Sequence, residues 1–216
     1  MTINIRKRQI RGVDLLDSWS GGHLLPTAYA TGRMVRFLAK VYSSKKGILS
    51  VDLGASAAII SAGFSDKSTL NVYPQFGLGE NLTGLLNYTK LEDILRWSSL
   101  DVSPGVLRDY MYQKAMYPSA IAATKEDLAI SQAIARQALY LAMQSARRDF
   151  PRNVAGIKPT LTPLFEPILA GGGALSDASR PGQGLLLLLD SIQPVGVTTV
   201  IIDQNNLLPL LGVTAS

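Results

Sequence analysis

Apolar residues in the first third of the chain recur at spacings that predict one helix followed by three strands. Within residues 27–42, they fall on a single helical face made by Ala30, Met34, Phe37, Leu38 and Val41. Short apolar runs then predict three strands, at residues 47–53, 57–63 and 69–73. The connections between these strands are a break at Gly54 and a polar turn at 65–68. Because both connections are short, we expect antiparallel pairing.

The pattern becomes helical over the next ninety or so residues. It predicts a helix over 78–97 with a break near Asn87, a second that starts at 103–105 and ends before Pro118, and a long helix after Thr124. Thr124 and Asp127 have the spacing of a capping box at the start of the long helix. Alanines on one face of this helix would let it pack closely against a sheet.

The last third alternates between strands and helices. Strands are predicted at 164–170 and 198–202, a helix at 181–192, and the start of a short helix at 205–211. This alternation implies parallel strands joined by right-handed crossovers. Glu166 and Pro167 weaken the first of these strands, since proline usually belongs at a strand edge or end. We therefore expect an α/β fold whose mixed sheet has three antiparallel and then parallel strands, with a helical insertion at about 78–120.

Composition excludes several classes of protein. A chain of 216 residues that is 47% hydrophobic can bury a full core. With no cysteine, there can be no disulfide framework, thiolate metal site or cysteine catalysis. The single histidine, His23, is expected in a loop beside two glycines. The longest fully apolar run, 185–189, is far shorter than the ~20 residues of a membrane span, and no secretory signal is visible, so a cytoplasmic protein is expected.

The net charge of +5 comes largely from basic residues before the first strand. These residues are Arg6, Lys7, Arg8, Arg11, Arg33, Arg36, Lys40, Lys45 and Lys46. No aromatic residues are interleaved with them to stack on bases, so we do not expect nucleic-acid binding. Residues 1–26 are interpreted as a basic, mobile leader.

Candidate chemistry lies where two predicted strands end in glycine-bearing turns, at 50–56 and 168–174. Asp52, at the end of a buried strand, is a hard oxygen ligand that would hold Mg²⁺ directly or through water. The other reading of Asp52 is a strand-end carboxylate that caps the next turn. After it, Gly54, Ala55 and Ser56 would present N–H groups to a phosphate, with the Ser56 hydroxyl as an extra donor.

The second turn carries Gly171, Gly172 and Gly173, which have no side chains and would let a nucleoside lie against the backbone. The helix after Pro181 would form the wall beside that nucleoside. Gly77 and Gly79 mark either another close approach or an ordinary turn into a helix.

The order of elements resembles the ribonuclease-H-like unit of the actin, sugar-kinase and heat-shock-chaperone ATPase superfamily, and within it the glutamate mutase L (MutL) family. The likeness is carried by residues 27–30, the Asp52 turn, residues 76–81, and a terminal series at 170–175, 181–190, 193–198 and 207–212. It covers 27–212, corresponds to the second (carboxyl-terminal) lobe of the superfamily, and leaves 213–216 as a tail. It implies ATP or ADP with Mg²⁺ as ligands and a role as chaperone or reactivating factor for a cobalamin-dependent mutase.

The chain departs from the superfamily in its phosphate turn. That turn usually reads Asp-x-Gly-Gly, a small residue, Thr-Thr and then Asp, whereas this chain has Ala55, Ala57, Ala58 and Ile59 at the later positions. Two hydroxyls and an acid that would assist phosphate transfer are therefore absent. We expect at most weak ATPase activity. No first-lobe turn is found before Thr27, which makes the missing first lobe a second candidate partner.

Three functions remain open from the sequence. The first is the nucleotide-dependent chaperone or reactivating factor. The second is a non-catalytic interaction scaffold on the same fold, and the third is a kinase for a small metabolite. The kinase needs a general base near the transferred phosphate, and only Asp52 presents itself. The partner and the oligomeric state are open as well.

Overall fold

The computed structural model describes residues 12–42, 46–150, 162–176, 178 and 180–215. Its centre is a five-stranded sheet in the order β3-β2-β1-β4-β5. The strands are β1 (Gly47–Leu53), β2 (Ala58–Gly63), β3 (Ser68–Tyr73), β4 (Phe165–Gly171) and β5 (Val200–Ile202). The first three pair antiparallel, while β4 runs parallel to both β1 and β5. The expected mixed α/β, ribonuclease-H-like fold is confirmed.

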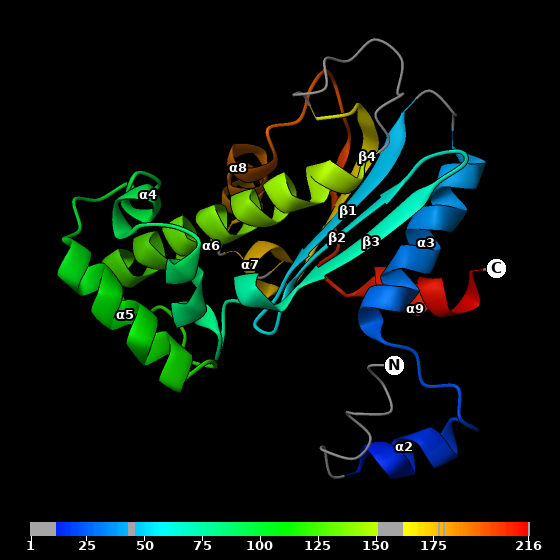
Figure 1. Ribbon diagram of the computed structural model, residues 1–216, viewed down its shortest axis with the longest axis horizontal. Coiled ribbons are helices and arrows are strands. Elements are labelled where there is room, and N and C mark those ends of the chain that lie inside the picture. Colours follow the sequence, from blue (N-terminus) through cyan, green and yellow to red (C-terminus); the bar gives the residue numbers. More distant parts are fainter. Residues whose placement is uncertain (1–11, 43–45, 151–161, 177, 179, 216) are drawn as a thin grey trace.

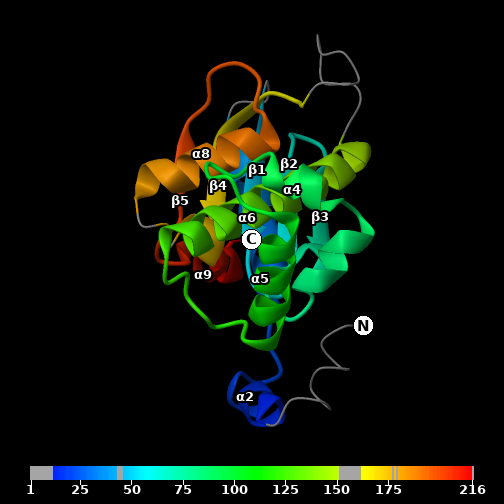
Figure 2. The same ribbon diagram turned by 90° about the vertical axis from the view of Figure 1, so that its left-hand side faces the viewer.

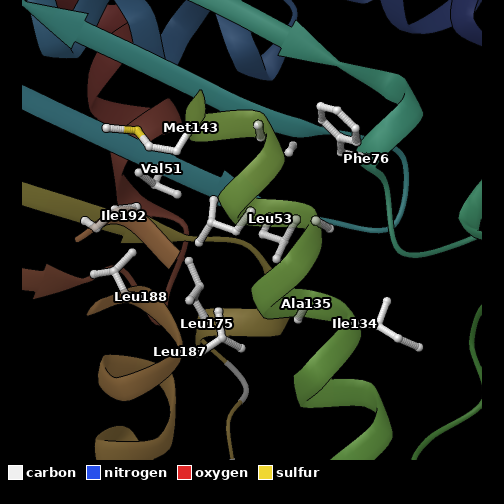
Figure 3. Close-up of a cluster of buried hydrophobic side chains, with 14 of the residues drawn as sticks. Val51, Leu53, Phe76, Ile134, Ala135, Met143, Leu175, Leu187, Leu188 and Ile192 are labelled. Carbon is white, nitrogen blue, oxygen red and sulfur yellow. The ribbon is translucent and has the colours of Figure 1, made fainter. Parts of the chain in front are cut away.

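Helices cover both faces of the sheet (Figure 1). On one face lie α3 (Thr27–Val41) and α9 (Leu207–Thr214), and on the other lie α6 (Lys125–Ala146) and α8 (Pro181–Ile192). Successive residues of β1 alternate between the two layers, as strand geometry requires. Val51 and Leu53 therefore join the core beneath α6 and α8 (Figure 3), whereas Ile48 packs with α3.

The long helix α6 begins and packs as its sequence predicts. The Thr124 hydroxyl accepts a hydrogen bond from Asp127 N, and the Asp127 carboxylate accepts one from Thr124 N, each at 3.0 Å. This capping box satisfies donors that the first turn would otherwise leave unpaired. The alanines at 133, 135, 138 and 142 are buried, and the helix packs against β2 and α8.

The helical insertion lies at one end of the sheet (Figures 1 and 2) and differs from the prediction in its first part. The continuous α-helical pattern expected over 78–97 is wrong, since shorter elements replace it, but the break expected near Asn87 is found where the first of them ends. These are η2 (Leu82–Asn87) and α4 (Leu91–Leu95); η1 (Pro74–Phe76) precedes them, and α5 (Pro104–Met116) follows as expected. Leu78 N and Gly79 N donate to Gly54 O and Ala55 O, so the backbone at 78–79 is committed to the turn after β1 rather than to a helix.

A buried polar side chain fastens this insertion to α6. Gln137 is 3% exposed and accepts a hydrogen bond of 2.7 Å from the indole N–H of Trp97. Its amide nitrogen donates to the Thr89 hydroxyl at 2.8 Å. A buried amide must be paired in this way to offset the loss of its bonds to water.

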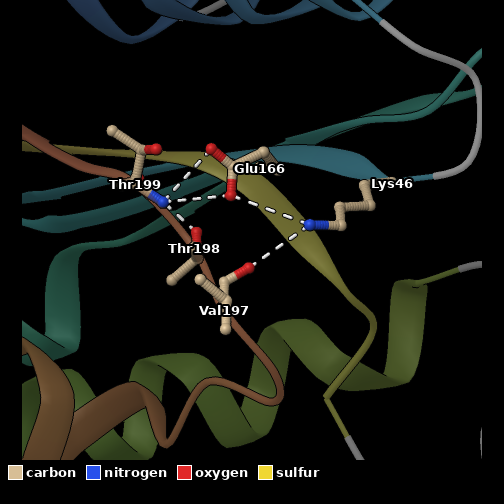
Figure 4. Close-up of polar contacts among 5 residues, drawn as sticks. All are labelled: Lys46, Glu166, Val197, Thr198 and Thr199. Carbon is tan, nitrogen blue, oxygen red and sulfur yellow. Dashed lines mark hydrogen bonds and ion pairs between the residues drawn. The ribbon is translucent and has the colours of Figure 1, made fainter.

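Pro167 is accommodated in β4 by an irregularity in its pairing with β1. Gly47 pairs with Phe165 but Leu49 pairs with Ile168, so Glu166 and Pro167 together stand opposite one residue of β1. The Glu166 carboxylate accepts from Thr199 N and lies 3.8 Å from Lys46 Nζ, which also donates to Val197 O (Figure 4). Hydrogen bonds from Thr199, followed by the charge of Lys46, hold the pKa of Glu166 below its ordinary value.

One further element lies near the amino terminus. A helix that the sequence analysis did not predict, α2 (Val13–Trp19), lies apart from the sheet in both views and buries none of its residues (Figures 1 and 2). Of the leader interpreted at 1–26, residues 1–11 lie outside the described residues, as do residues 151–161. None of the described helices has the length and apolar character needed to cross a bilayer.

Candidate functional site

The two glycine-bearing exits meet at one edge of the sheet. Because β1 and β4 are parallel neighbours, their carboxyl ends lie side by side, with Asp52 opposite Gly171. Gly172 has a positive φ of 83°. A Cβ at this position would lie 2.5 Å from Leu53 O and 2.6 Å from Asp52 Oδ1. The second exit therefore rests directly on the first, which only a residue without a side chain allows.

The turn after β1 leaves backbone donors available. Gly54 N donates to Ala57 O at 3.1 Å, and the carbonyls of Gly54 and Ala55 are used by residues 78 and 79. Within the described part of the chain, the N–H groups of Ala55 and Ser56 find no acceptor, and both residues are exposed. Adjacent free N–H groups in a turn are suited to an anion such as phosphate.

Gly77 and Gly79 lie behind this turn. Both are buried, and a Cβ would come within 2.6 Å of Ala55 O at Gly77 and 3.0 Å of it at Gly79. Both glycines therefore lie close to the backbone of the turn, and their approach to a nucleotide stays a prediction. In this buried position they pack against the inner face of the turn.

A cavity of about 670 Å³ is lined by both exits. Gly54 and Ala55 contribute from the first, and Gly173 and Ala174 from the second, where α7 (Gly173–Ser176) begins. Its other walls come from α5, the connection between α5 and α6, α6 itself and the start of α8. The lining residues of α5 and the connection are Tyr110, Lys114 and residues 118–124. Those of α6 and α8 are Lys125, Leu128, Ser131, Gln132, Ile134, Ala135, Gln183, Gly184 and Leu187. The volume is within the range of small-molecule sites.

The charged residues in the described lining of this cavity are all basic. Lys114 and Lys125 contribute side chains, and among its described residues there is no acid. Burial lowers the pKa of Lys114, whose ammonium group donates to Ala120 O. The insertion thus supplies cationic and polar groups, along with Gln183 on α8, that sequence reasoning missed. Nothing in their spacing marks them, because they converge only when α5, α6 and α8 pack together.

Asp52 lies on the opposite side of the exits from this cavity. Strand alternation places it with Ile48 and Ser50 on the α3 and α9 side, and neither it nor Ser56 is among the cavity-lining residues. Burial, followed by the negative charge of Asp203, raises the pKa of Asp52. The site residues named from sequence therefore form one contiguous group around the exits, divided between two faces.

Asp203 is a second acid at this edge that sequence reasoning missed. It follows β5 directly, and its carboxylate oxygens each accept a hydrogen bond of 2.8 Å, from Leu207 N and Leu208 N at the start of α9. An Asp immediately after a predicted parallel strand was the signal that could have identified it. Both of its oxygens are occupied by the helix, so Asp203 acts on Asp52 through charge.

The chemistry of these acids sets limits on a metal ion. The described residues contain no group of three or more side chains able to hold one. Mg²⁺ often binds to one or two carboxylates while keeping waters and phosphate oxygens as its remaining ligands. Asp52 fits that role, and the exits do not fit an ion held by protein ligands alone.

Comparison with known proteins supplies the family. A family model described as MutL protein matches residues 4–216. The chain belongs to the MutL protein family. No curated protein matches the sequence.

Two solved structures with similar folds cover most of this chain. One is the activator of the 2-hydroxyisocaproyl-CoA dehydratase from Clostridium difficile with bound ADPNP, at 13% identity and a TM-score of 0.42 over 88% of this chain. The other is a type IV pilus biogenesis complex, PilM–PilN, at 18% identity and a TM-score of 0.38 over 92% of this chain. The chain spans 66% of the first structure's length and 52% of the second's.

Proposed function

We propose that this MutL-family chain is a nucleotide-binding lobe that serves as a chaperone or reactivating factor for a cobalamin-dependent carbon-skeleton mutase. One observation carries the nucleotide part: Gly54 and Ala55 line the same cavity as Gly173 and Ala174. A nucleoside in the cavity would have its phosphates at the free N–H groups of the first exit. Family membership supports the chaperone part, because the resemblance to glutamate mutase L implies a mutase as partner.

Hydrolysis is not part of this proposal. The turn has methyl groups where the superfamily has threonine hydroxyls, and the cavity lining carries no described acid or histidine that could act as a general base. Bound nucleotide would then act as a conformational ligand, favouring the state of the lobe to which it binds more tightly. We expect no phosphate release above the background rate.

Calorimetric titration of the chain with ATP and ADP, with and without Mg²⁺, tests the site. Asp52→Asn should weaken Mg²⁺-dependent binding by roughly tenfold, because it removes the charged ligand of the ion, and by more than Ser56→Ala does. In EDTA, Asp52→Asn should bind nucleotide no more weakly than wild type. Equal affinities of wild type and Asp52→Asn in Mg²⁺ would contradict the role of Asp52, and no binding at millimolar nucleotide would contradict the site itself.

The interaction scaffold is the second candidate, and the surface of α9 favours it. This helix exposes four large apolar side chains, at Leu207, Leu210, Leu211 and Val213, each more than half exposed. Such a patch is typical of a surface that a protein partner covers, whether that partner is a mutase or a separate first lobe. Stoichiometric binding to a purified partner that is unchanged by nucleotide and lost in Leu210→Glu would favour the scaffold over the nucleotide-dependent factor.

A further inference from the structure

The strand β3 forms one edge of the sheet and has no neighbour on its outer side among the described residues (Figure 1). Its six residues pair with β2 in an unbroken register. Proteins usually protect such an edge with a charge, a proline, a bulge or a very short strand. The sequence of β3, STLNVY, contains no charged residue and no proline, whereas β5 at the opposite edge has only three residues. Within the described chain, β3 therefore carries none of these protections.

The hairpin between β2 and β3 decides which backbone groups of β3 point outward. Phe64 N donates to Lys67 O at 2.7 Å, so these two residues form a hydrogen-bonded pair. Hydrogen-bonded and non-hydrogen-bonded pairs alternate along an antiparallel ladder. The residues whose N–H and C=O groups point away from β2 are therefore Ser68, Leu70 and Val72. These groups find no backbone partner in the described part of the chain.

The two faces of β3 have different surroundings. Leu70 and Val72 share the face on which α3 packs, and their side chains are 38% and 46% exposed. On the opposite face, the Asn71 amide nitrogen donates to the Asp149 carboxylate at 3.0 Å, just beyond the end of α6. Lys67 is exposed and points to this second face, because alternate side chains of a strand lie on the same face.

We propose that two copies of this chain associate by pairing their β3 strands antiparallel, with the two-fold axis at Leu70. In this register Leu70 lies opposite Leu70 of the second copy, and Ser68 lies opposite its Val72. All outward N–H and C=O groups of β3 are then hydrogen-bonded in both copies. A shift of two residues in one direction would place Ser68 opposite Pro74, which has no N–H. The opposite shift would place Val72 against Asp66 in the turn, so the register at Leu70 is the one that pairs the whole edge.

Charge favours the same register. It places Lys67 opposite Tyr73 of the second copy, on the face where Asp149 lies. Burial, followed by the charge of Asp149, raises the pKa of Tyr73, while Arg148 opposes this change more weakly. Each copy would thus bring an exposed lysine to a region of the other copy in which the nearest charge is negative, and opposite charges across a strand pair are stabilising. Because β3 itself is uncharged, no like charges face each other along the paired strands.

Sedimentation equilibrium of the full chain without nucleotide measures this association. A pairing confined to one strand from each copy is small, so we expect a reversible dimer with a dissociation constant in the micromolar range. Val72→Lys should weaken the dimer roughly tenfold, because it places a charge on the apolar edge in both copies. Ile201→Lys is the matched control and should leave the dimer unchanged, since Ile201 is also 46% exposed but lies in β5 at the other edge. Circular dichroism checks that each variant is folded.

Single cysteines test the register, because the chain has none of its own. Opposite residues of a hydrogen-bonded antiparallel pair have Cα atoms about 5.5 Å apart, a distance that a disulfide can span. Leu70→Cys should therefore form a covalent dimer on mild oxidation. Ser68→Cys should not, because the two copies of residue 68 would be roughly 14 Å apart in this register.

A charge exchange tests the contact between the copies. Lys67→Glu should weaken the dimer, and adding Asp149→Lys to the same chain should restore it, as opposite charges would again face each other.

The outcomes that would overturn the proposal are distinct. A chain that stays monomeric at concentrations of hundreds of micromolar has no such interface. A dimer that Ile201→Lys or Leu210→Glu weakens, and that Val72→Lys leaves intact, uses another surface. Covalent dimers from Ser68→Cys and none from Leu70→Cys would overturn the register at Leu70.

Discussion

Replacing Gly172 by alanine tests whether the two strand exits rest on each other as the structure has them. The new methyl group would lie 2.5 Å from Leu53 O and 2.6 Å from Asp52 Oδ1, at a residue whose φ is 83°. Holding a side chain at positive φ costs roughly 1–2 kcal/mol, and forcing a methyl group into an occupied space costs roughly 1–3 kcal/mol. We expect Gly172→Ala to lower the free energy of unfolding by roughly 2–5 kcal/mol.

Urea unfolding followed by circular dichroism measures this loss, and Gly182→Ala is the matched control. Gly182 lies in the first turn of α8, has a negative φ, and would place its Cβ in open space. There the same substitution should stabilise the protein by about 0.4–1 kcal/mol, because it restricts the unfolded chain. If Gly172→Ala were as stable as Gly182→Ala, the contact between the exits would be refuted, along with the shared cavity built on it.

Three further predictions concern stability. The raised pKa of Asp52 means that the folded protein binds its proton more tightly than the unfolded chain, so stability falls as pH rises through the folded-state pKa. Asp52→Asn should therefore raise the free energy of unfolding, and by more at neutral pH than at low pH. An increase that does not depend on pH would contradict the raised pKa that burial and Asp203 give to Asp52. Gln137→Leu should lower the free energy of unfolding by about 2 kcal/mol, because it leaves the Trp97 indole N–H without its acceptor. The tryptophan fluorescence should change as well, and unchanged fluorescence would contradict the contact. Thr124→Ala should cost about 1 kcal/mol in urea unfolding through loss of the α6 cap, and no loss would show that the cap is not formed.

The elements best predicted from sequence are those whose signals are local. The span of α8 and that of β1 match the structure residue for residue, because each combines an apolar run with a clear boundary, Pro181 for the helix and glycines for the strand. The first part of the insertion was predicted wrongly, since hydrogen bonds from Leu78 and Gly79 to a turn more than twenty residues earlier outcompete a helix there. Local pattern carries no information about such a distant acceptor.

The same division holds for the candidate site. The glycines and Asp52 could be named from sequence because the ends of parallel strands are recognisable and meet at one edge of a sheet. The sequence did not predict toward which face of the sheet Asp52 and each glycine turn would lie. Asp52 faces α9 and Asp203, whereas Gly54 and Gly173 open into a cavity whose other walls come from α5, α6 and α8.

The sequence by itself thus determined the order and direction of the strands, the caps of the long helix, and the loss of the hydroxyls in the first turn. These follow from side-chain period and backbone stereochemistry, which act over a few residues. Only the tertiary structure decided that Gly172 rests on Leu53 and that Lys114 lines the cavity. Such contacts join residues far apart in the chain, and they exist only once the packing of helices on the sheet has set the distances between them.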